Sequence, residues 1–169
     1  MSFIDDDQIT IEQLEEGLAR MDAKIYELGL EIRGTMSNNA TPFLGMAYEP
    51  TEEEALEIKA AMGEAIELFE HLWYQKHQNT ILERRIRAKY GTEYTIRDLE
   101  ELCRQRIMRM MEIQGLMMLC PGWTWFCMSK KEHTNMGLVE AMRHRLTEMK
   151  AECEEIEEEN ERMRARLNE

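Results

Sequence analysis

Apolar residues recur at alternating intervals of three and four in two segments of the chain, one near each end. This spacing places the apolar side chains on one narrow stripe of a helix and is typical of a coiled-coil seam. The first predicted seam is Ile11, Leu14, Leu18, Met21, Ile25, Leu28 and Ile32. The second, predicted as an oligomerisation seam, is Val139, Met142, Leu146, Met149, Cys153, Ile156, Asn160, Met163 and Leu167. Both segments are therefore predicted to be long helices that bind another helix.

Four helix-start signals divide the chain. In each, a hydroxyl residue is followed three positions later by an acid or amide, so the two residues can cap each other's backbone N–H groups. The pairs are Thr10 with Gln13, Thr51 with Glu54, Thr95 with Asp98, and Ser129 with Glu132. With Gly34 and Gly91 as helix stops, they predict helices over residues 11–33, 52–90, 96–119 and 129–169. A break in the second helix near Gln78 and Asn79 is an alternative to one continuous helix.

These elements predict an all-α fold. We expect a four-helix bundle-like arrangement of two long and two shorter helices with a C-terminal coiled-coil arm. Residues 1–128 form the helical region and residues 129–169 the coiled-coil helix. Composition agrees: 33% of the 169 residues are charged, 7% are aromatic, and there are only 3 prolines. That balance is typical of long helices rather than of a sheet with many turns.

The charges beside the C-terminal seam do not decide which helix the seam binds. Asn160 occupies a core position, where a polar residue fixes register and strand number at a cost in stability. In a parallel homodimer, Arg145 would face Lys150 and Glu152 would face Glu157, and both pairs repel. A helix of different sequence, or an antiparallel mate, is therefore a serious alternative to a parallel homodimer.

The third helix ends in a methionine-rich stretch, Met108 to Met118, that is apolar on nearly every side. This pattern predicts a buried helix, either within one chain or between chains. Methionines at helical spacing favour core filling, and a surface for varied apolar partners is the alternative. The loop residues Trp123, Trp125 and Phe126 are a candidate interface, because tryptophan is enriched at binding hot spots. Capping of the bundle's end explains them equally well.

The net charge of −13 disfavours nucleic acid as the main ligand, because such binding depends on neutralising phosphates. One stretch, Glu83 to Arg109, reverses the balance with eight basic against five acidic residues. We interpret it as a solvated face with ion pairs along the helix. Contact with an acidic surface, including that of a second copy, is the alternative.

No catalytic motif is present in the sequence, and we predict a protein that is not an enzyme and uses no cofactor. Two helical pairs, Glu67 with His71 and Glu140 with His144, have the wrong spacing for a di-metal bundle site. We interpret them as surface ion pairs.

The cysteine spacing is equally poor for zinc. Cys120 and Cys127 lie seven positions apart with His133 nearby, whereas structural zinc sites use close cysteine pairs. All four cysteines are expected to be reduced thiols, consistent with a cytoplasmic protein. The first residues lack the pattern of a secretion signal, and no uninterrupted apolar run is long enough to span a membrane.

The sequence therefore predicts a non-catalytic structural or adaptor subunit of an oligomeric assembly, working through coiled-coil and helix–helix contacts. Its partner would be a second copy or a different helical subunit. A component of a virion or phage, assembled in the cytoplasm, is one assembly of this kind. The alternative is an acidic inhibitor or chaperone that occupies a basic site on another protein, because acidic residues are in large excess.

Overall fold

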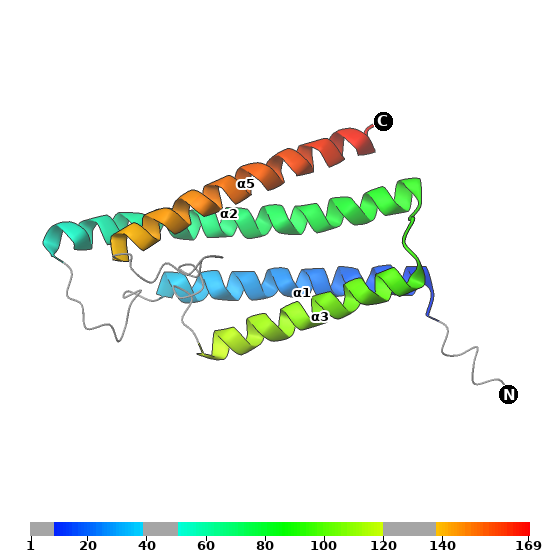
Figure 1. Cartoon of the computed structure of the whole chain (residues 1–169), viewed down its shortest axis with the longest axis horizontal. Coiled ribbons are helices and arrows are strands. Elements are labelled where there is room, and N and C mark those ends of the chain that lie inside the picture. The colour runs from blue at the N-terminus through cyan, green and yellow to red at the C-terminus, as the bar shows by residue number, and fades with distance from the viewer. Residues whose placement is uncertain (1–8, 39–50, 120–137) are drawn as a thin grey trace.

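The computed structural model describes residues 9–38, 51–119 and 138–169. This part of the chain is built from helices and contains no strand, which confirms the predicted all-α class. The helices are α1 (Ile11–Asn38), α2 (Glu52–Tyr90), α3 (Ile96–Leu119) and α5 (Leu138–Leu167) (Figure 1). They pack against one another as a helical bundle.

Three of the four predicted capping pairs begin helices as expected. The N–H of Gln13 donates to Oγ1 of Thr10 at 3.1 Å, and the N–H of Thr10 donates to Oε1 of Gln13 at 3.0 Å. The same reciprocal arrangement joins Thr95 and Asp98. Thr51 caps α2 by accepting from the N–H of Glu54. The fourth pair, Ser129 and Glu132, lies outside the described residues.

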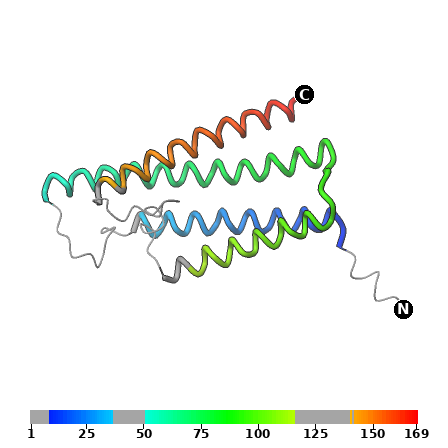
Figure 2. Tube along the Cα trace, viewed as in Figure 1, coloured from blue at the N-terminus to red at the C-terminus, as the bar shows by residue number. Residues whose placement is uncertain are grey.

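The helices form two parallel pairs, α2 with α5 and α1 with α3, as Figures 1 and 2 show. The two pairs meet where α1 packs antiparallel to α2. A short turn, residues 91–95, reverses the chain between α2 and α3. Each parallel pair therefore joins helices that are distant in the sequence.

The first helix does not end at Gly34, which corrects one prediction. It continues to Asn38, and Met36, two residues past the expected stop, is fully buried in the core. A glycine inside a helix costs only about 1 kcal/mol, whereas burying a methionine side chain contributes about 1.5–3 kcal/mol. Burial of Met36 therefore outweighs the glycine.

The second helix is continuous, so the alternative break near Asn79 does not occur. It ends at Gly91, as predicted, where a φ of 82° is a conformation that favours glycine.

Most of the core lies where α2, α5 and α1 meet. Its buried side chains include Leu28, Ile32, Met36, Ile58, Ala65, Phe69, Leu72, Trp73, Ile113, Met142, Leu146 and Met149. A second, smaller cluster of Leu14, Leu18 and Leu99 joins α1 to α3. Gly29 permits the close approach of α1 to α2, since a Cβ there would lie 2.5 Å from Cδ2 of Trp73.

The third helix is not buried all round, which corrects the prediction for the methionine-rich stretch. Ile113 is fully buried, but Met108 and Met111 are 70% and 66% exposed, and Ile107 is also exposed. Only one neighbouring helix, α1, packs extensively along α3, so its opposite face is left without cover in the described part of the chain. The side chains of Leu116, Met117 and Met118 lie outside the described residues.

Candidate functional site

The C-terminal seam packs along α2 of the same chain. Three ion pairs cross this contact at seven-residue steps on both helices: Arg143 with Glu57 at 2.7 Å, Lys150 with Glu64 at 2.5 Å, and His71 with Glu157. Residue numbers rise together, so the helices run parallel. A charged pair therefore recurs once every seven residues on both helices, beside the apolar contact between them.

Asn160 forms the polar layer of this seam. Its side chain is fully buried, and its Oδ1 accepts a hydrogen bond from Nδ2 of Asn79 at 2.9 Å. Its Nδ2 donates to the backbone carbonyl and to Oε1 of Gln75, at 3.1 and 3.0 Å. Because an asparagine pair is satisfied only when the two residues are opposite each other, this layer sets the register of α5 on α2.

The predicted oligomerisation seam is thus largely covered within one chain. Met142, Leu146, Met149, Cys153 and Asn160 are buried. Ile156, Met163 and Leu167 are partly buried, and the side chain of Val139 lies outside the described residues. Of the first predicted seam, Leu14, Leu18, Leu28 and Ile32 are buried, Met21 and Ile25 are partly buried, and Ile11 is exposed. A helix of different sequence does pair with the C-terminal seam, and it belongs to the same chain.

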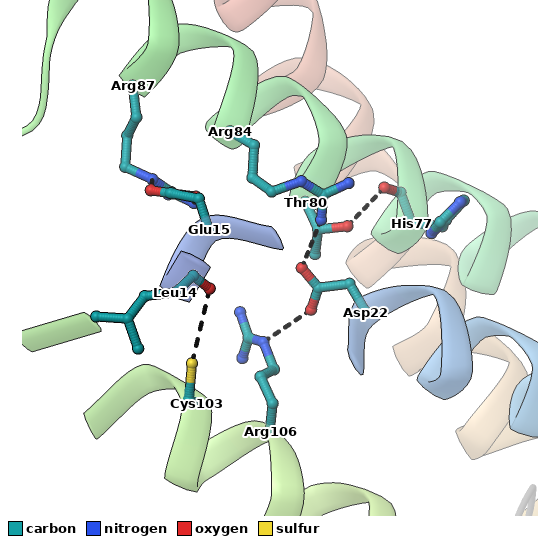
Figure 3. Close-up of polar contacts among 9 residues, drawn as sticks. All are labelled: Leu14, Glu15, Asp22, His77, Thr80, Arg84, Arg87, Cys103 and Arg106. Carbon is teal, nitrogen blue, oxygen red and sulfur yellow. Dashed lines mark hydrogen bonds and ion pairs between the residues drawn. The ribbon is translucent and has the colours of Figure 1, made fainter. Parts of the chain in front are cut away.

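A buried carboxylate ties three helices together near the middle of the bundle. Asp22 of α1 is only 7% exposed. Its Oδ2 accepts from Nη1 of Arg84 on α2, and its Oδ1 accepts from Nε of Arg106 on α3, both at 2.9 Å (Figure 3). A buried carboxylate is stable only when its charge is compensated and its lone pairs are hydrogen-bonded, and the two guanidinium groups supply both.

A second ion pair lies beside this network. Glu15 of α1 accepts two hydrogen bonds from Arg87 of α2, at 2.7 and 3.0 Å, in the bidentate geometry that makes such pairs strong. Hydrogen bonding to Glu15 is the main cause of the raised pKa of Arg87. The basic stretch is therefore not simply a solvated face, because Arg84, Arg87 and Arg106 bridge between helices. Arg104 and Arg109 do pair along their own helix, with Glu101 and Glu112.

A cleft of about 240 Å³ adjoins the Asp22 network and has lining residues from all four helices. On its wall His77 stacks on Tyr26, with ring centroids 4.4 Å apart. Burial, and then the charge of Arg84, lower the pKa of His77, and its Nδ1 is buried without a hydrogen-bond partner in the described residues. The ring is accordingly neutral at pH 7.

Glu83, one residue before Arg84 on α2, also has a perturbed pKa. Burial raises the pKa of this carboxyl group, and the carboxylate of Glu159 on α5 raises it further, while Arg87 and Arg106 oppose the shift. The carboxyl group of Glu83 therefore lies among both basic and acidic groups, and its burial decides the direction of the pKa shift.

A larger groove, of about 690 Å³, lies between α1 and α2 near the start of α1. Its lining includes small or apolar side chains, Ile11, Ala19, Ile81 and Ala88, together with the ion-paired Glu15 and Arg87. Glu12 and Glu16 of α1 stand on one side and Arg84 and Arg85 of α2 on the other. The groove therefore has one acidic and one basic wall.

The two histidines of the predicted helical pairs do form ion pairs, but with acidic residues other than Glu67 and Glu140. His71 pairs with Glu157, and His144 pairs with Glu148 at 2.8 Å. Within residues 9–38, 51–119 and 138–169, no three histidine, cysteine or acidic side chains are placed to hold a metal ion. Cys103 and Cys153 are free thiols, and burial raises the pKa of Cys153 to about 11. Cys120, Cys127, His133 and the loop residues Trp123, Trp125 and Phe126 lie outside the described residues.

Comparison with protein-family models, with curated proteins and with solved structures gives no match to this chain. None of the helices in the described part of the chain combines the length and hydropathy needed to span a lipid bilayer.

Proposed function

We propose that this protein is a non-catalytic structural or adaptor subunit of an oligomeric assembly, held in it by helix–helix contacts. One observation carries the proposal: the outward face of α3 presents Ile107, Met108 and Met111 to solvent. We call these three residues the α3 ridge. Contiguous apolar side chains on the outside of a folded bundle mark an interaction site.

The packing of the C-terminal seam moves the interaction surface away from the coiled coil itself. With α5 packed on α2, the α3 ridge is an apolar helix face of the described residues that a neighbour can cover. Methionine suits such a face because its unbranched, polarizable side chain adapts to irregular surfaces.

The test is the native mass of the protein, measured on the purified chain and on tagged chain recovered from cells. We expect particles heavier than the 20.1 kDa chain, and we expect the double variant Met108→Glu, Met111→Glu to return to the mass of one chain. Leu56→Glu is the matched control, because Leu56 is also 70% exposed but lies on α2. A wild-type protein that has the mass of one chain in both preparations contradicts the proposal.

The alternative function, an acidic inhibitor or chaperone that binds a basic site, draws on a different surface. Along the outside of α5, Glu154, Glu155, Glu158 and Glu161 are exposed, and like charges on one face attract a basic partner over long range. Binding of this kind weakens steeply with salt because screening shortens the reach of the field. Recovery of a heavier complex at low salt that is lost at about 0.5 M salt, and is unaffected by the α3 variants, favours this second function.

A further inference from the structure

The groove between α1 and α2 and the α3 ridge are complementary surfaces on the same chain. The groove is a hollow with a largely apolar lining crossed by the Glu15–Arg87 ion pair. Three charged groups of its lining, Glu12, Glu16 and Arg85, form no ion pair with the described residues. The ridge is a raised apolar stripe that nothing in the described part of the chain covers. One surface therefore supplies the hollow and the other the projection that helix packing requires.

The charges beside the ridge match those beside the groove. Arg104 lies four residues before Met108 and Glu112 four residues after it, and each four-residue step turns a helix about 40° beyond one full turn. The basic and the acidic side chain therefore stand on opposite sides of the line through Met108. Arg104 and Glu112 pair with Glu101 and Arg109 along their own helix, and exposed pairs of this kind are weak enough to exchange partners. With Arg104 toward Glu16, Glu112 is placed toward Arg85, so both sides of the groove meet opposite charges and the direction of the docked helix is fixed.

The dimensions agree as well. The groove follows α1 from Ile11 to Ala19, a rise of roughly 12 Å, and the ridge with its flanking charges runs from Arg104 to Glu112, again roughly 12 Å. The small side chains of the lining, Ala19 and Ala88, let a second helix come close, and the methionines can adapt to the remaining space because their side chains are unbranched.

We infer that the α3 ridge of one copy docks into the α1–α2 groove of a second copy. This names the partner of the surface on which the proposed function rests. The contact is heterologous, because two different surfaces meet, so each bound copy still offers one free ridge and one free groove. Copies then add head to tail, and assembly grows into a ring or a filament rather than stopping at a dimer. The contact is short, so association is expected only at concentrations of about 10 μM or more.

Two variants test this on the full chain. Ala88→Arg places a long cationic side chain in the groove, where Ala88 is exposed, and so blocks it. Met108→Glu with Met111→Glu destroys the ridge. Sedimentation velocity at rising concentration should show oligomers for the wild type and only single chains for either variant alone. An equal mixture of the two variants should form dimers and nothing larger, because it contains one intact groove and one intact ridge per pair.

Each other outcome overturns the inference. A wild type that stays a single chain at all concentrations shows that the surfaces do not bind each other, and a mixture that behaves like its two components shows the same. A groove variant that still dimerises indicates that two ridges pack together about a two-fold axis. Circular dichroism and the midpoint of urea unfolding establish that both variants are folded.

A charge exchange gives a second, independent measurement. Glu16→Arg should reduce self-association about tenfold, and Arg104→Glu should do the same. An equal mixture of the two single variants should recover association, because every contact between unlike variants joins opposite charges at positions 16 and 104. Equal affinities for wild type, single variants and mixture contradict the orientation given above. The test of the proposed function stands apart from this one, because chain recovered from cells in a heavier particle supports an adaptor role even when purified copies do not bind one another.

Discussion

The Asn160 layer allows a quantitative test of how α5 is held on α2. Replacing Asn160 with Ala removes three hydrogen bonds, each worth about 1 kcal/mol net, and leaves a gap in a fully buried position. The expected loss in the free energy of unfolding is about 2–4 kcal/mol. Replacing it with Ile fills the space but leaves the amide of Asn79 unpaired, at about 1–2 kcal/mol, the lower part of the usual range because Asn79 is only partly buried.

Changing both asparagines should reverse the loss. The double variant Asn79→Ile, Asn160→Ile places β-branched residues at facing core positions, which favours two strands, and neither asparagine amide remains to be left unpaired. Gln75 loses the hydrogen bonds from Asn160, but it is only partly buried, so water can replace them. Its free energy of unfolding should equal or exceed that of the wild type, so the two substitutions should differ from additivity by about 2 kcal/mol. The same variant should lose the unique register, because the layer that penalises a shifted α5 is gone.

Urea unfolding followed by circular dichroism measures both effects, with Glu161→Ala as the control. Glu161 is exposed next to Asn160, and its replacement should change the free energy of unfolding by less than about 0.5 kcal/mol. Additive effects of the two Ile substitutions, or an Asn160→Ile variant as stable as the wild type, would refute the claim that the asparagines form one coupled unit.

Three further predictions concern the rest of the bundle. Asp22→Ala should lower the free energy of unfolding by about 2–4 kcal/mol in urea titrations, because it leaves two partly buried guanidinium groups uncompensated; a loss below about 0.5 kcal/mol would show that water replaces the carboxylate. Gly29→Ala should lower the free energy of unfolding by about 1–3 kcal/mol, because the added Cβ overlaps Trp73. Gly63→Ala should raise it by about 0.5–1 kcal/mol, because a Cβ there meets nothing within 4 Å. Equal shifts of the melting temperature in the two variants would contradict the close packing at Gly29. Since the folded-state pKa of Glu83 is raised, its carboxyl group favours folding below the unfolded pKa near 4.5 and loses that contribution as pH rises through the folded value. Glu83→Gln should therefore gain stability over the wild type as pH rises from about 4 to 7, and a difference that does not change with pH would rule this out.

The helices themselves were largely predictable, because their determinants are local. Capping pairs and seam periodicity gave α1, α2 and α3 with correct starts, and Gly91 gave the end of α2. Gly34 gave the wrong end for α1. The helix continues past it because Met36 packs against residues that are distant in the sequence. A local stop signal is weaker than burial of a large side chain.

The pairing of the helices was harder to predict, although one signal was present. The repulsions in a parallel homodimer of the C-terminal seam pointed to a helix of different sequence. The α2 residues Ile58, Ala65, Leu72 and Asn79 stand seven apart, in the register that matches Asn160. The spacing within one helix does not say which other apolar stripe of the chain it contacts, so the heptad of α2 did not by itself identify α5 as its mate.

The buried charge network was missed for a different reason. Asp22 sits directly beside seam residue Met21, and its partners are 62 and 84 positions away in the sequence. No local rule distinguishes such an acid from the many solvated ones in an acidic chain. The exposure of Met108 likewise depends on how the other helices pack around α3. The spacing of apolar residues along α3 does not contain that information.

The two parallel pairs have a consequence for the order in which the protein can form during synthesis. A ribosome releases α2 well before α5, and the residues that hold them together, such as Glu57 and Arg143, are 86 positions apart. The seam of α2 that α5 will cover is therefore exposed while α3 and the following segment are still being made. Contacts between distant residues also slow folding relative to bundles made of hairpin-linked neighbours. During this interval the α2 seam is open to the α5 of another nascent chain, so crowded polysomes favour exchange of α5 between copies.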